Sequence, residues 1–478
     1  MTSLAATLHA RSPRHSPPAV PLASRLIGAV GPILFCALIV QAFLRQGLAV
    51  WSIGIVYILY DTALLAFTAV KIAPLRHGLP ARASAAAVRP TLAVIVAAHN
   101  EAGVLAATIA RLAGQAEAPD TILIADDGSS DATPQLFASR YGLATPRYGE
   151  TMRGGTEPSL VWLRLRHGGK ARALNAAMLA TDAAIVLTVD ADTLLEPGAI
   201  AAMRAAFAAE PELVAATGVL APICGPHLSG RLFQWFQSFE YVRNFLSRHA
   251  WEQPGCLLLI SGAFAAFRRD AVVAVGGFDP DCLVEDYELI HRLHRHAAEA
   301  RLDWRVRVVG GALARTDAPA SIPAFLKQRR RWFGGFLQTQ HWNRDMVGDR
   351  RFGALGTAMM PVKTLDTLQP IYGLAAFAIL IGLVVTGRFA IALPILLVMI
   401  AKIAVDLTFH LWSLGIYKRW TGQREGLGIG AALIAAILEP FSFQLLRHAG
   451  AVWGWHAFLT GRGGWGVQRR TAIAGEGA

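Results

Sequence analysis

The chain has 478 residues, of which 54% are apolar by type and only 16% are charged. A soluble domain carries about 25% charged residues, so this composition excludes a small secreted domain and indicates a protein partly surrounded by lipid. The net charge of +12 fits a nucleic acid, an anionic membrane surface or a phosphate-bearing substrate, and the positions of the charges must decide between them. The four cysteines form no CxxC pair, so neither a disulfide scaffold nor a zinc cluster is expected.

A transmembrane helical hairpin is predicted over residues 26–70. Its two apolar stretches, the first without a charged side chain and the second with only Asp61, approach the roughly 20 residues that a helix needs to cross a bilayer. A cleaved signal peptide fits poorly, because a leader of 25 residues precedes the first stretch and a second apolar stretch follows at once. Basic residues follow the hairpin, so residues 1–25 and the region after residue 70 are expected in the cytoplasm. Asp61 either pairs with a neighbouring helix or lies near the membrane interface.

The character of the sequence changes between residues 90 and 335. Short runs rich in β-branched residues alternate there with Ala-rich stretches of helical pattern, and four runs are predicted as strands: 92–97, 121–124, 160–165 and 184–189. This alternation is typical of βαβ units with a mainly parallel sheet. We therefore expect a cytoplasmic α/β domain over residues 90–335.

Apolar segments return beyond this domain. After an interfacial segment at 336–363, residues 364–447 are expected to hold about three transmembrane helices, the last of them interrupted by Glu439-Pro440. The candidates are 364–386, 389–414 and 427–446. Three crossings would place the tail, 448–478, outside, whereas its basic residues favour the inside. One segment is therefore re-entrant or interfacial, or residues 359–361 begin an extra crossing, and the sequence leaves the number of crossings open.

Carboxylates gather where predicted strands end. Asp126 and Asp127 follow the second strand, and Asp190-Ala191-Asp192 follows the fourth. In an open parallel sheet, ligands bind beyond the carboxyl ends of the strands, and side-chain alternation turns Asp190 and Asp192 to the same side. Mg²⁺ and Mn²⁺ commonly combine one or two carboxylates with substrate phosphates. The adjacent pair, Asp126 and Asp127, needs a partner, which is either a metal ion or a base or sugar hydroxyl.

Two polar segments accompany these acids. His99-Asn100-Glu101 follows the first strand, where it either meets a ligand or caps the next helix. The loop at 167–175 has two glycines that allow close backbone approach to a ligand and, in Lys170, a positive charge for phosphate. It lacks the first glycine and the Ser or Thr of a Walker A loop.

Later motifs open or occupy predicted helices. Glu285 and Asp286 either complement a helix dipole or provide, in Asp286, a general base for an acceptor hydroxyl. Histidines 291, 294 and 296 favour a metal site only weakly, because arginines crowd them and their spacing does not match i,i+4 ligand pairs. The segment Gln328-Arg329-Arg330-Arg331-Trp332 is either a lipid anchor or a group in which Arg331 neutralises a leaving diphosphate and Trp332 supports a sugar ring.

Together these motifs resemble the membrane-embedded family 2 glycosyltransferases, the processive group that includes cellulose, chitin, hyaluronan and poly-N-acetylglucosamine synthases. The resemblance rests on Asp126-Asp127-Gly128-Ser129, Asp190-Ala191-Asp192, Glu285-Asp286 and residues 328–332, in the order of the family and between two groups of membrane helices. It implies an α/β GT-A fold that binds a nucleotide sugar on a mostly parallel sheet. Val284 stands where cellulose synthases have Thr, which argues against cellulose as the product.

The resemblance also implies roles for individual residues. Asp286 would be the catalytic base, and Asp192 would hold a Mg²⁺ or Mn²⁺ ion. Residues 261–264 and 277–278 resemble the wall of the acceptor pocket. The residues implied to bind substrate are Ala98, Glu101, Asp127, Lys170, Asp190, Glu285, Gln328, Arg331 and Trp332.

The expected function is inverting, metal-dependent transfer of a sugar from a UDP-sugar to a growing polysaccharide at the inner membrane, processive and coupled to export. One alternative is a non-processive transferase with a lipid-linked acceptor, and a second is a nucleotide-binding transporter or sensor. The expected partners are the donor, a polysaccharide or lipid-linked acceptor and membrane lipid. Nucleic acid is not expected, because the arginines cluster beside membrane segments, and accessory subunits stay an open question.

Overall fold

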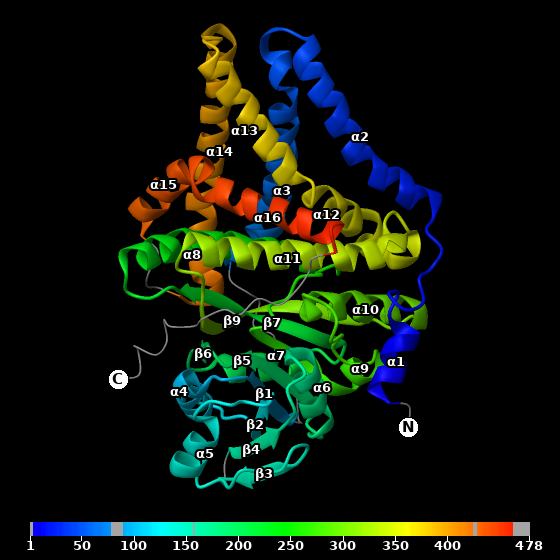
Figure 1. Cartoon of the computed structure of the whole chain (residues 1–478), viewed down its shortest axis with the longest axis vertical. Coiled ribbons are helices and arrows are strands. Elements are labelled where there is room, and N and C mark those ends of the chain that lie inside the picture. Colours follow the sequence, from blue (N-terminus) through cyan, green and yellow to red (C-terminus); the bar gives the residue numbers. More distant parts are fainter. Residues whose placement is uncertain (1–2, 78–88, 156–157, 424–427, 462–478) are drawn as a thin grey trace.

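The computed structural model describes residues 3–77, 89–155, 158–423 and 428–461. A mixed α/β domain forms the lower half of the molecule, and long apolar helices project away from it (Figure 1). Two helices, α8 (Leu228–Glu252) and α11 (Ile322–Trp342), lie across the molecule between these two parts. The basic residues that were expected to set the side of the tail lie beyond residue 461, outside the described residues.

The strands that the structure describes form one mixed sheet in the order β3-β4-β2-β1-β5-β8-β7-β9-β6. The four predicted strands are confirmed as β1, β2, β4 and β5, which pair in parallel. In the other half, β8 runs antiparallel to β5 and β7, while β7 is parallel to β9. The expected parallel arrangement therefore describes the half built from β1, β2, β4 and β5. The strands are β1 (Leu92–Ala98), β2 (Thr121–Asp126), β3 (Thr151–Gly154), β4 (Ser159–Arg164), β5 (Ile185–Asp190), β6 (Thr193–Leu195), β7 (Leu213–Ile223), β8 (Phe264–Arg268) and β9 (Arg305–Asp317).

Helices cover the sheet because its central strands are apolar on both faces. In β1, every side chain from Leu92 to Val96 is completely buried, as expected for a strand with helices on both sides. The next helix, α4, buries a stripe that includes Val104, Leu105 and Ile109, which matches the helical period. The helices of the domain are α4 (Ala102–Ala113), α5 (Thr133–Tyr141), α6 (Lys170–Leu179), α7 (Ala199–Ala209), α8, α9 (Arg269–Ala274), α10 (Glu285–Ala300) and α11.

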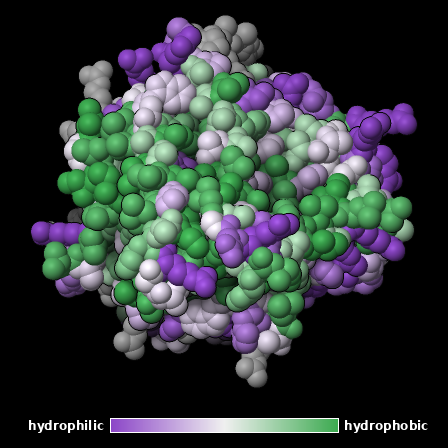
Figure 2. All heavy atoms as spheres, turned by 90° about the horizontal axis from the view of Figure 1, so that it is seen from above, coloured by the Kyte–Doolittle hydropathy of each residue, from purple (hydrophilic) through white to green (hydrophobic). Residues whose placement is uncertain are grey.

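Four helical stretches of the described chain are long and apolar enough to cross a membrane: Leu22–Leu44, Gly47–His77, Leu355–Val385 and Phe389–Thr421. Figure 2 looks onto the end of the molecule from which they project, where apolar residues cover large continuous areas. Such an exposed apolar surface is unusual for a soluble protein and suits lipid. The regular helices outside the α/β domain are α1 (Leu4–Arg11), α2 (Leu22–Leu44), α3 (Ser52–Ile72), α12 (Met360–Asp366), α13 (Gln369–Val385), α14 (Phe389–Thr421), α15 (Ile429–Leu438) and α16 (Phe443–Leu459).

The last apolar segment, expected over 427–446 with an interruption at Glu439-Pro440, is bent at that place. Helices α15 and α16 meet at 47°, separated by a single turn at Glu439–Phe441. Pro440 cannot donate a backbone hydrogen bond within a helix. The buried carboxylate of Glu439 also accepts a 2.6 Å hydrogen bond from Arg243 of α8, which draws the bend toward the α/β domain. The other end of the expected segment begins at residue 427, outside the described residues.

Asp61 pairs with a neighbouring helix, the first of its two alternatives. Its Oδ2 atom lies 2.7 Å from Nζ of Lys402 on α14, and Lys402 also pairs with Asp406 of the same helix. Gln369 of α13 donates a hydrogen bond to Oδ1 of Asp61 at 3.2 Å. Three apolar helices are thus joined by one group of charges, which is costly to separate in an apolar medium.

We expect Lys402→Met to destabilise the protein by about 3 kcal/mol, because it leaves two carboxylates without their cation. The melting temperature in detergent, followed by tryptophan fluorescence, measures the loss. Adding Asp61→Asn and Asp406→Asn to Lys402→Met should restore much of the stability, since no unpaired charge then remains. Equal melting temperatures for the single and triple variants would contradict this account.

Candidate active site

A cavity of about 1120 Å³ opens beyond the carboxyl ends of β1, β2 and β5 and extends between α8, α11 and α16. The residues that the family resemblance implies as base, metal ligand or substrate contacts come from segments far apart in the chain, yet all of them line this one cavity. They are Ala98, Glu101, Asp127, Lys170, Asp190, Asp192, Glu285, Asp286, Gln328, Arg331 and Trp332.

Asp127 lies at one end of the cavity, where the loop after β4 passes over the end of β2. Its carboxylate accepts hydrogen bonds from the backbone N–H groups of Gly168 at 2.8 Å and Gly169 at 2.9 Å. The rings of His99 and His167 stack above it, with their centres 4.2 Å apart. Two flat rings beside a buried carboxylate form a surface suited to a planar, hydrogen-bonding group such as a nucleobase.

Asp126, which the sequence grouped with Asp127, does not line the cavity. Its side chain is completely buried and accepts hydrogen bonds from the backbone N–H of Ser129 at 2.8 Å and from the indole of Trp162 at 3.2 Å. The two carboxylates therefore do not share a ligand, because the strand turns them to opposite sides. Asp126 shapes the turn that presents Asp127.

Lys170, at the start of α6, connects two acids that are far apart in the sequence. Its Nζ atom lies 2.5 Å from Oδ1 of Asp190 and 3.6 Å from Oε1 of Glu285. Burial lowers the pKa of Lys170, but the charges of the two carboxylates outweigh burial and raise the pKa above its usual value. Lys170 is therefore a permanent cation at the centre of the cavity.

Asp286 is held by the backbone at the start of α10. Its Oδ2 atom accepts a 2.7 Å hydrogen bond from the N–H of Gly262, and Oδ1 accepts one from the N–H of Tyr287 at 2.8 Å. A Cβ atom at position 262 would come within 2.8 Å of Oδ2, so a larger residue would displace the carboxylate. The neighbouring Glu285 is buried, and this burial raises its pKa, an effect that Lys170 opposes.

The motif at 328–332 lies on α11, and its arginines have separate contacts. Arg331 donates a 3.2 Å hydrogen bond to the carbonyl of Leu283, in the loop just before Asp286. Arg329 is buried and pairs with Glu240 of α8 at 2.7 Å. Its guanidinium also stacks on Trp332, 4.5 Å from the ring centre. The motif thus joins α8, α11 and the loop that leads to Asp286.

Two places near the cavity have side chains suited to a divalent cation. Asp190 and Asp192 line the cavity beyond β5 and offer the hard oxygen atoms that Mg²⁺ and Mn²⁺ prefer. In a second group, His99, Asp127 and His167 each place one ligand atom within 4.8 Å of the others. Asp127 already accepts two backbone hydrogen bonds there, and Asp190 of the first pair already contacts Lys170 at 2.5 Å. The weaker suggestion of histidines 291, 294 and 296 is not supported, since His291 and His294 are buried and bond to separate backbone carbonyls.

Two family models match the chain. The model for "Glycosyl transferase family 2" matches residues 93–276, and that for "Glycosyl transferase family group 2" matches residues 185–404. The chain contains a family 2 glycosyltransferase domain. The resemblance inferred from the motifs is thereby confirmed for the family and for the class of enzyme.

The glycosyltransferase domain has similar relatives among known proteins. Poly-β-1,6-N-acetyl-D-glucosamine synthase of Staphylococcus aureus (strain MSSA476) is 26% identical over 245 residues, which are 50% of this chain and 53% of that protein. The enzyme of the same name from Staphylococcus epidermidis is also 26% identical, over 247 residues that are 51% of this chain and 54% of the relative. The chain therefore spans about half the length of the curated relatives that it matches.

A solved structure shares the fold of the glycosyltransferase. A mannosyltransferase from Pyrobaculum calidifontis, in complex with GDP-Man and Mn²⁺, aligns with a TM-score of 0.52 over 82% of this chain and 99% of its own. The sequence identity is 19%, so the likeness shows the fold alone. The expected GT-A-like α/β fold is confirmed.

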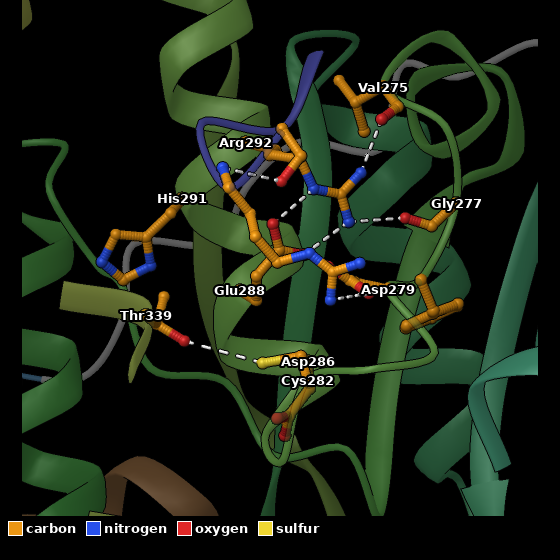
Figure 3. Close-up of polar contacts among 12 residues, drawn as sticks. Val275, Gly277, Asp279, Cys282, Asp286, Glu288, His291, Arg292 and Thr339 are labelled. Carbon is orange, nitrogen blue, oxygen red and sulfur yellow. Dashed lines mark hydrogen bonds and ion pairs between the residues drawn. The ribbon is translucent and has the colours of Figure 1, made fainter. Parts of the chain in front are cut away.

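A buried ion pair of the glycosyltransferase holds the loop that leads to Asp286 (Figure 3). Glu288 and Arg292, one turn apart on α10, lie 2.6 Å apart and are almost completely buried. The same guanidinium donates to the carbonyls of Val275 at 2.5 Å and Gly277 at 2.6 Å. The chain segment before α10 is therefore tied to the helix that begins with the catalytic candidates.

The N-terminal segment contacts the same loop. Arg14 lies 3.3 Å from the buried carboxylate of Asp279 and 2.8 Å from the exposed carboxylate of Asp281. Leu8 of α1 packs on Gly276, whose φ is +92° and where a Cβ atom would come within 2.3 Å of the Leu8 backbone. Only glycine suits this position, because of both its conformation and its contact.

We expect Arg292→Met to lower kcat by about tenfold or more, because the loop before Asp286 loses two hydrogen bonds from one buried guanidinium, those to the carbonyls of Val275 and Gly277. The KM for the donor should change by less than about twofold, since the contacts between Lys170 and Asp190 stay intact. Steady-state kinetics measure both constants, and the exposed Arg111→Ala serves as the control. A rise in the donor KM without a fall in kcat would contradict this account.

Two supporting residues were not singled out from the sequence. Asn175 of α6 accepts a hydrogen bond from the N–H of Phe278 at 2.7 Å and donates one to the carbonyl of Phe278 at 2.8 Å. Arg292 is the second. The sequence carried a signal for Asn175, because this residue belongs to the glycine-containing segment at 167–175. It carried none for Arg292, which is one of several charged residues in the predicted helix.

Proposed function

We propose that the protein transfers a sugar, with inversion, from a UDP-sugar to a growing polysaccharide at a membrane. One observation carries the proposal: a single cavity contains the residues suited to a nucleotide diphosphate and Asp286, and continues from there to the apolar helices. The names of the staphylococcal relatives support N-acetylglucosamine as the first sugar to test.

The reaction needs one base and stabilisation of one leaving group. Asp286 would accept the proton of the acceptor hydroxyl while that oxygen bonds to C1 of the donor sugar. The bond from C1 to the diphosphate oxygen breaks on the opposite face, which inverts the configuration, and UDP leaves. Lys170 and Arg331 would balance the charge that develops on the diphosphate. No carboxylic acid is required for the leaving group, unlike in a glycosidase.

The carboxylates of Asp190 and Asp192 would hold a divalent ion beside the diphosphate of the donor. Mg²⁺ or Mn²⁺ would supply positive charge to the two phosphates of the donor. Lys170 keeps Asp190 oriented by their 2.5 Å contact.

The membrane arrangement follows from the four long apolar helices. We propose that α2, α3, the stretch Leu355–Val385 and α14 cross the inner membrane, while α11 and the bent pair α15–α16 lie at its cytoplasmic face. An even number of crossings leaves both ends of the described chain on the side of the catalytic domain. Lys71 and Arg76, at the end of the second crossing, support a cytoplasmic position for that side.

The proposal is tested with purified protein in detergent, Mn²⁺ or Mg²⁺, and a panel of UDP-N-acetylglucosamine, UDP-glucose and GDP-mannose. We expect release of UDP from UDP-N-acetylglucosamine and a product of many sugars in mass spectrometry. A product with one added sugar on a lipid would replace the processive function with the lipid-linked alternative. The absence of nucleotide release from every donor would overturn the enzyme assignment and favour a transporter or sensor.

A further inference from the structure

The cavity continues past Asp286 into a part that we call the upper arm, lined by α8, α12, α13 and α16. One face of α8 runs along the arm, because positions 240, 241, 244 and 248 follow the helical period. The polar residues that line the upper arm are Glu240, Tyr241, Asn244, Arg248, Lys363, Gln369, Arg447 and His448. Planar amides, charged groups and aromatic rings together are the side chains that bind sugars in proteins.

Three cations in or beside the upper arm have acidic partners. Arg329 pairs with Glu240 at 2.7 Å, and Arg447 lies 3.6 Å from the other oxygen of the same carboxylate. Lys363 pairs with Asp366 at 2.8 Å. The first two pairs join α8, α11 and α16, and the third lies within α12, so all three cations are occupied by the fold.

Arg248 differs from these cations. Its Nε and Nη1 atoms are buried and make no hydrogen bond to any residue that the structure describes. Its guanidinium stacks on Phe245 of the same helix, 4.6 Å from the ring centre. Burial lowers its pKa to about 10, and the acid whose charge most opposes this effect is Asp286. Arg248 therefore stays charged at neutral pH and lies on the side of the cavity that faces the base.

Buried donors without a partner are rare in folded proteins, and each one calls for an explanation. A guanidinium donates hydrogen bonds and cannot accept them, so its partner must offer oxygen atoms. An anionic partner would bring a second negative charge toward Asp286 and is disfavoured. A neutral group with an exposed oxygen, such as the acyl carbonyl or a hydroxyl of a sugar, satisfies both conditions.

We propose that Arg248 binds the terminal sugar of the acceptor and orients its attacking hydroxyl toward Asp286. This inference rests on the proposed glycosyl transfer and adds the residue that recognises the acceptor. Arg248 lines the same cavity as Asp286 and comes from α8, whereas the candidate donor contacts Asp127, Lys170 and Asp190 come from the ends of β2 and β5 and the start of α6. Arg248 should therefore affect the acceptor and leave the donor unaffected.

The kinetic test uses Arg248→Lys and Arg248→Gln in the full-length protein, with a β-1,6-linked N-acetylglucosamine tetrasaccharide as the added acceptor. We expect the KM for the tetrasaccharide to rise at least tenfold in both variants. The KM for UDP-N-acetylglucosamine and the slow release of UDP without acceptor should stay within about twofold of the unchanged protein. Arg231→Ala, an exposed arginine at the other end of α8, should match the unchanged protein in every constant.

A second measurement does not depend on the variants folding or on turnover. Butanedione modifies accessible arginines, and mass spectrometry of the peptide that contains Arg248 reports the rate for that residue. We expect the tetrasaccharide to slow modification of Arg248 at least threefold and UDP with Mn²⁺ not to slow it.

The outcomes separate this inference from the proposed function. An unchanged tetrasaccharide KM in the variants, or protection of Arg248 by UDP instead of the tetrasaccharide, would overturn the role of Arg248 while transfer by the unchanged protein continues. The absence of nucleotide release from every donor in the unchanged protein would overturn the proposed function itself.

Discussion

Asp286→Asn should reduce kcat for sugar transfer by about 10³-fold, within the range of 10² to 10⁴ that a general base contributes. Asparagine has the same shape and keeps the hydrogen bond from the N–H of Gly262, but its single acceptor oxygen cannot also accept from the N–H of Tyr287. What the variant loses is the ability to take the proton of the acceptor hydroxyl. The KM for the UDP-sugar should change by less than about twofold, because the donor contacts are made by other residues.

Initial rates of UDP release at saturating donor and acceptor measure this effect. Asp270→Asn is a matched control, because its side chain is 97% exposed and lies outside the cavity. The melting temperature of Asp286→Asn should equal that of the control within about 2 °C. A kcat within threefold of the unchanged protein would exclude Asp286 as the base and would assign that role to another group.

Removal of divalent cations should abolish transfer, and addition of Mn²⁺ or Mg²⁺ should restore it. The reason is that Lys170 and Arg331 alone would balance only part of the charge on the departing diphosphate. Asp192→Asn should raise the Mn²⁺ concentration for half-maximal activity at least tenfold, because one of two carboxylates near the diphosphate is lost. The electron paramagnetic resonance signal of Mn²⁺, recorded with UDP and without turnover, compares the binding of Mn²⁺ by the unchanged protein with its binding by Asp192→Asn.

The second group of candidate ligands provides the control for this metal prediction. A variant with both His99→Gln and His167→Gln removes two of the three candidate ligands of this group, leaving only Asp127. Asp190 and Asp192 stay unchanged. Its Mn²⁺ dependence should match that of the unchanged protein, even where the donor KM rises. A loss of Mn²⁺ binding in this variant, with normal binding in Asp192→Asn, would move the metal site to the two histidines.

The acids at the strand ends show how much of the site could be predicted from the sequence. Asp127, Asp190 and Asp192 follow runs so apolar that only buried strands explain them, and parallel strands bring their carboxyl ends to one edge. Asp126 could not be separated from Asp127 in the same way, because the sequence does not reveal that Trp162 lies beneath it. Local pattern thus identifies the edge of the sheet, and packing decides which acid faces the ligand.

Contacts between distant segments explain what the sequence did not reveal. Arg248 reads as one of several charges on an ordinary helix, and its special position depends on which other arginines find acidic partners. The bend between α15 and α16 has a local signal in Pro440, but its direction depends on the pairing of Glu439 with Arg243. The antiparallel position of β8 likewise follows from long-range pairing, which no strand pattern encodes.

The contact between Arg14 and Asp279 constrains how the chain enters the membrane. Arg14 precedes α2, and Asp279 belongs to the catalytic domain that follows α3. In the membrane arrangement proposed above, both ends of the pair α2 and α3 therefore stay on one side of the bilayer, and the turn around Gln46 lies at the other face. A polypeptide fused ahead of Leu4 would remain on the side of the catalytic domain instead of being exported. The location of such a fusion would therefore report the orientation of α2 in the membrane.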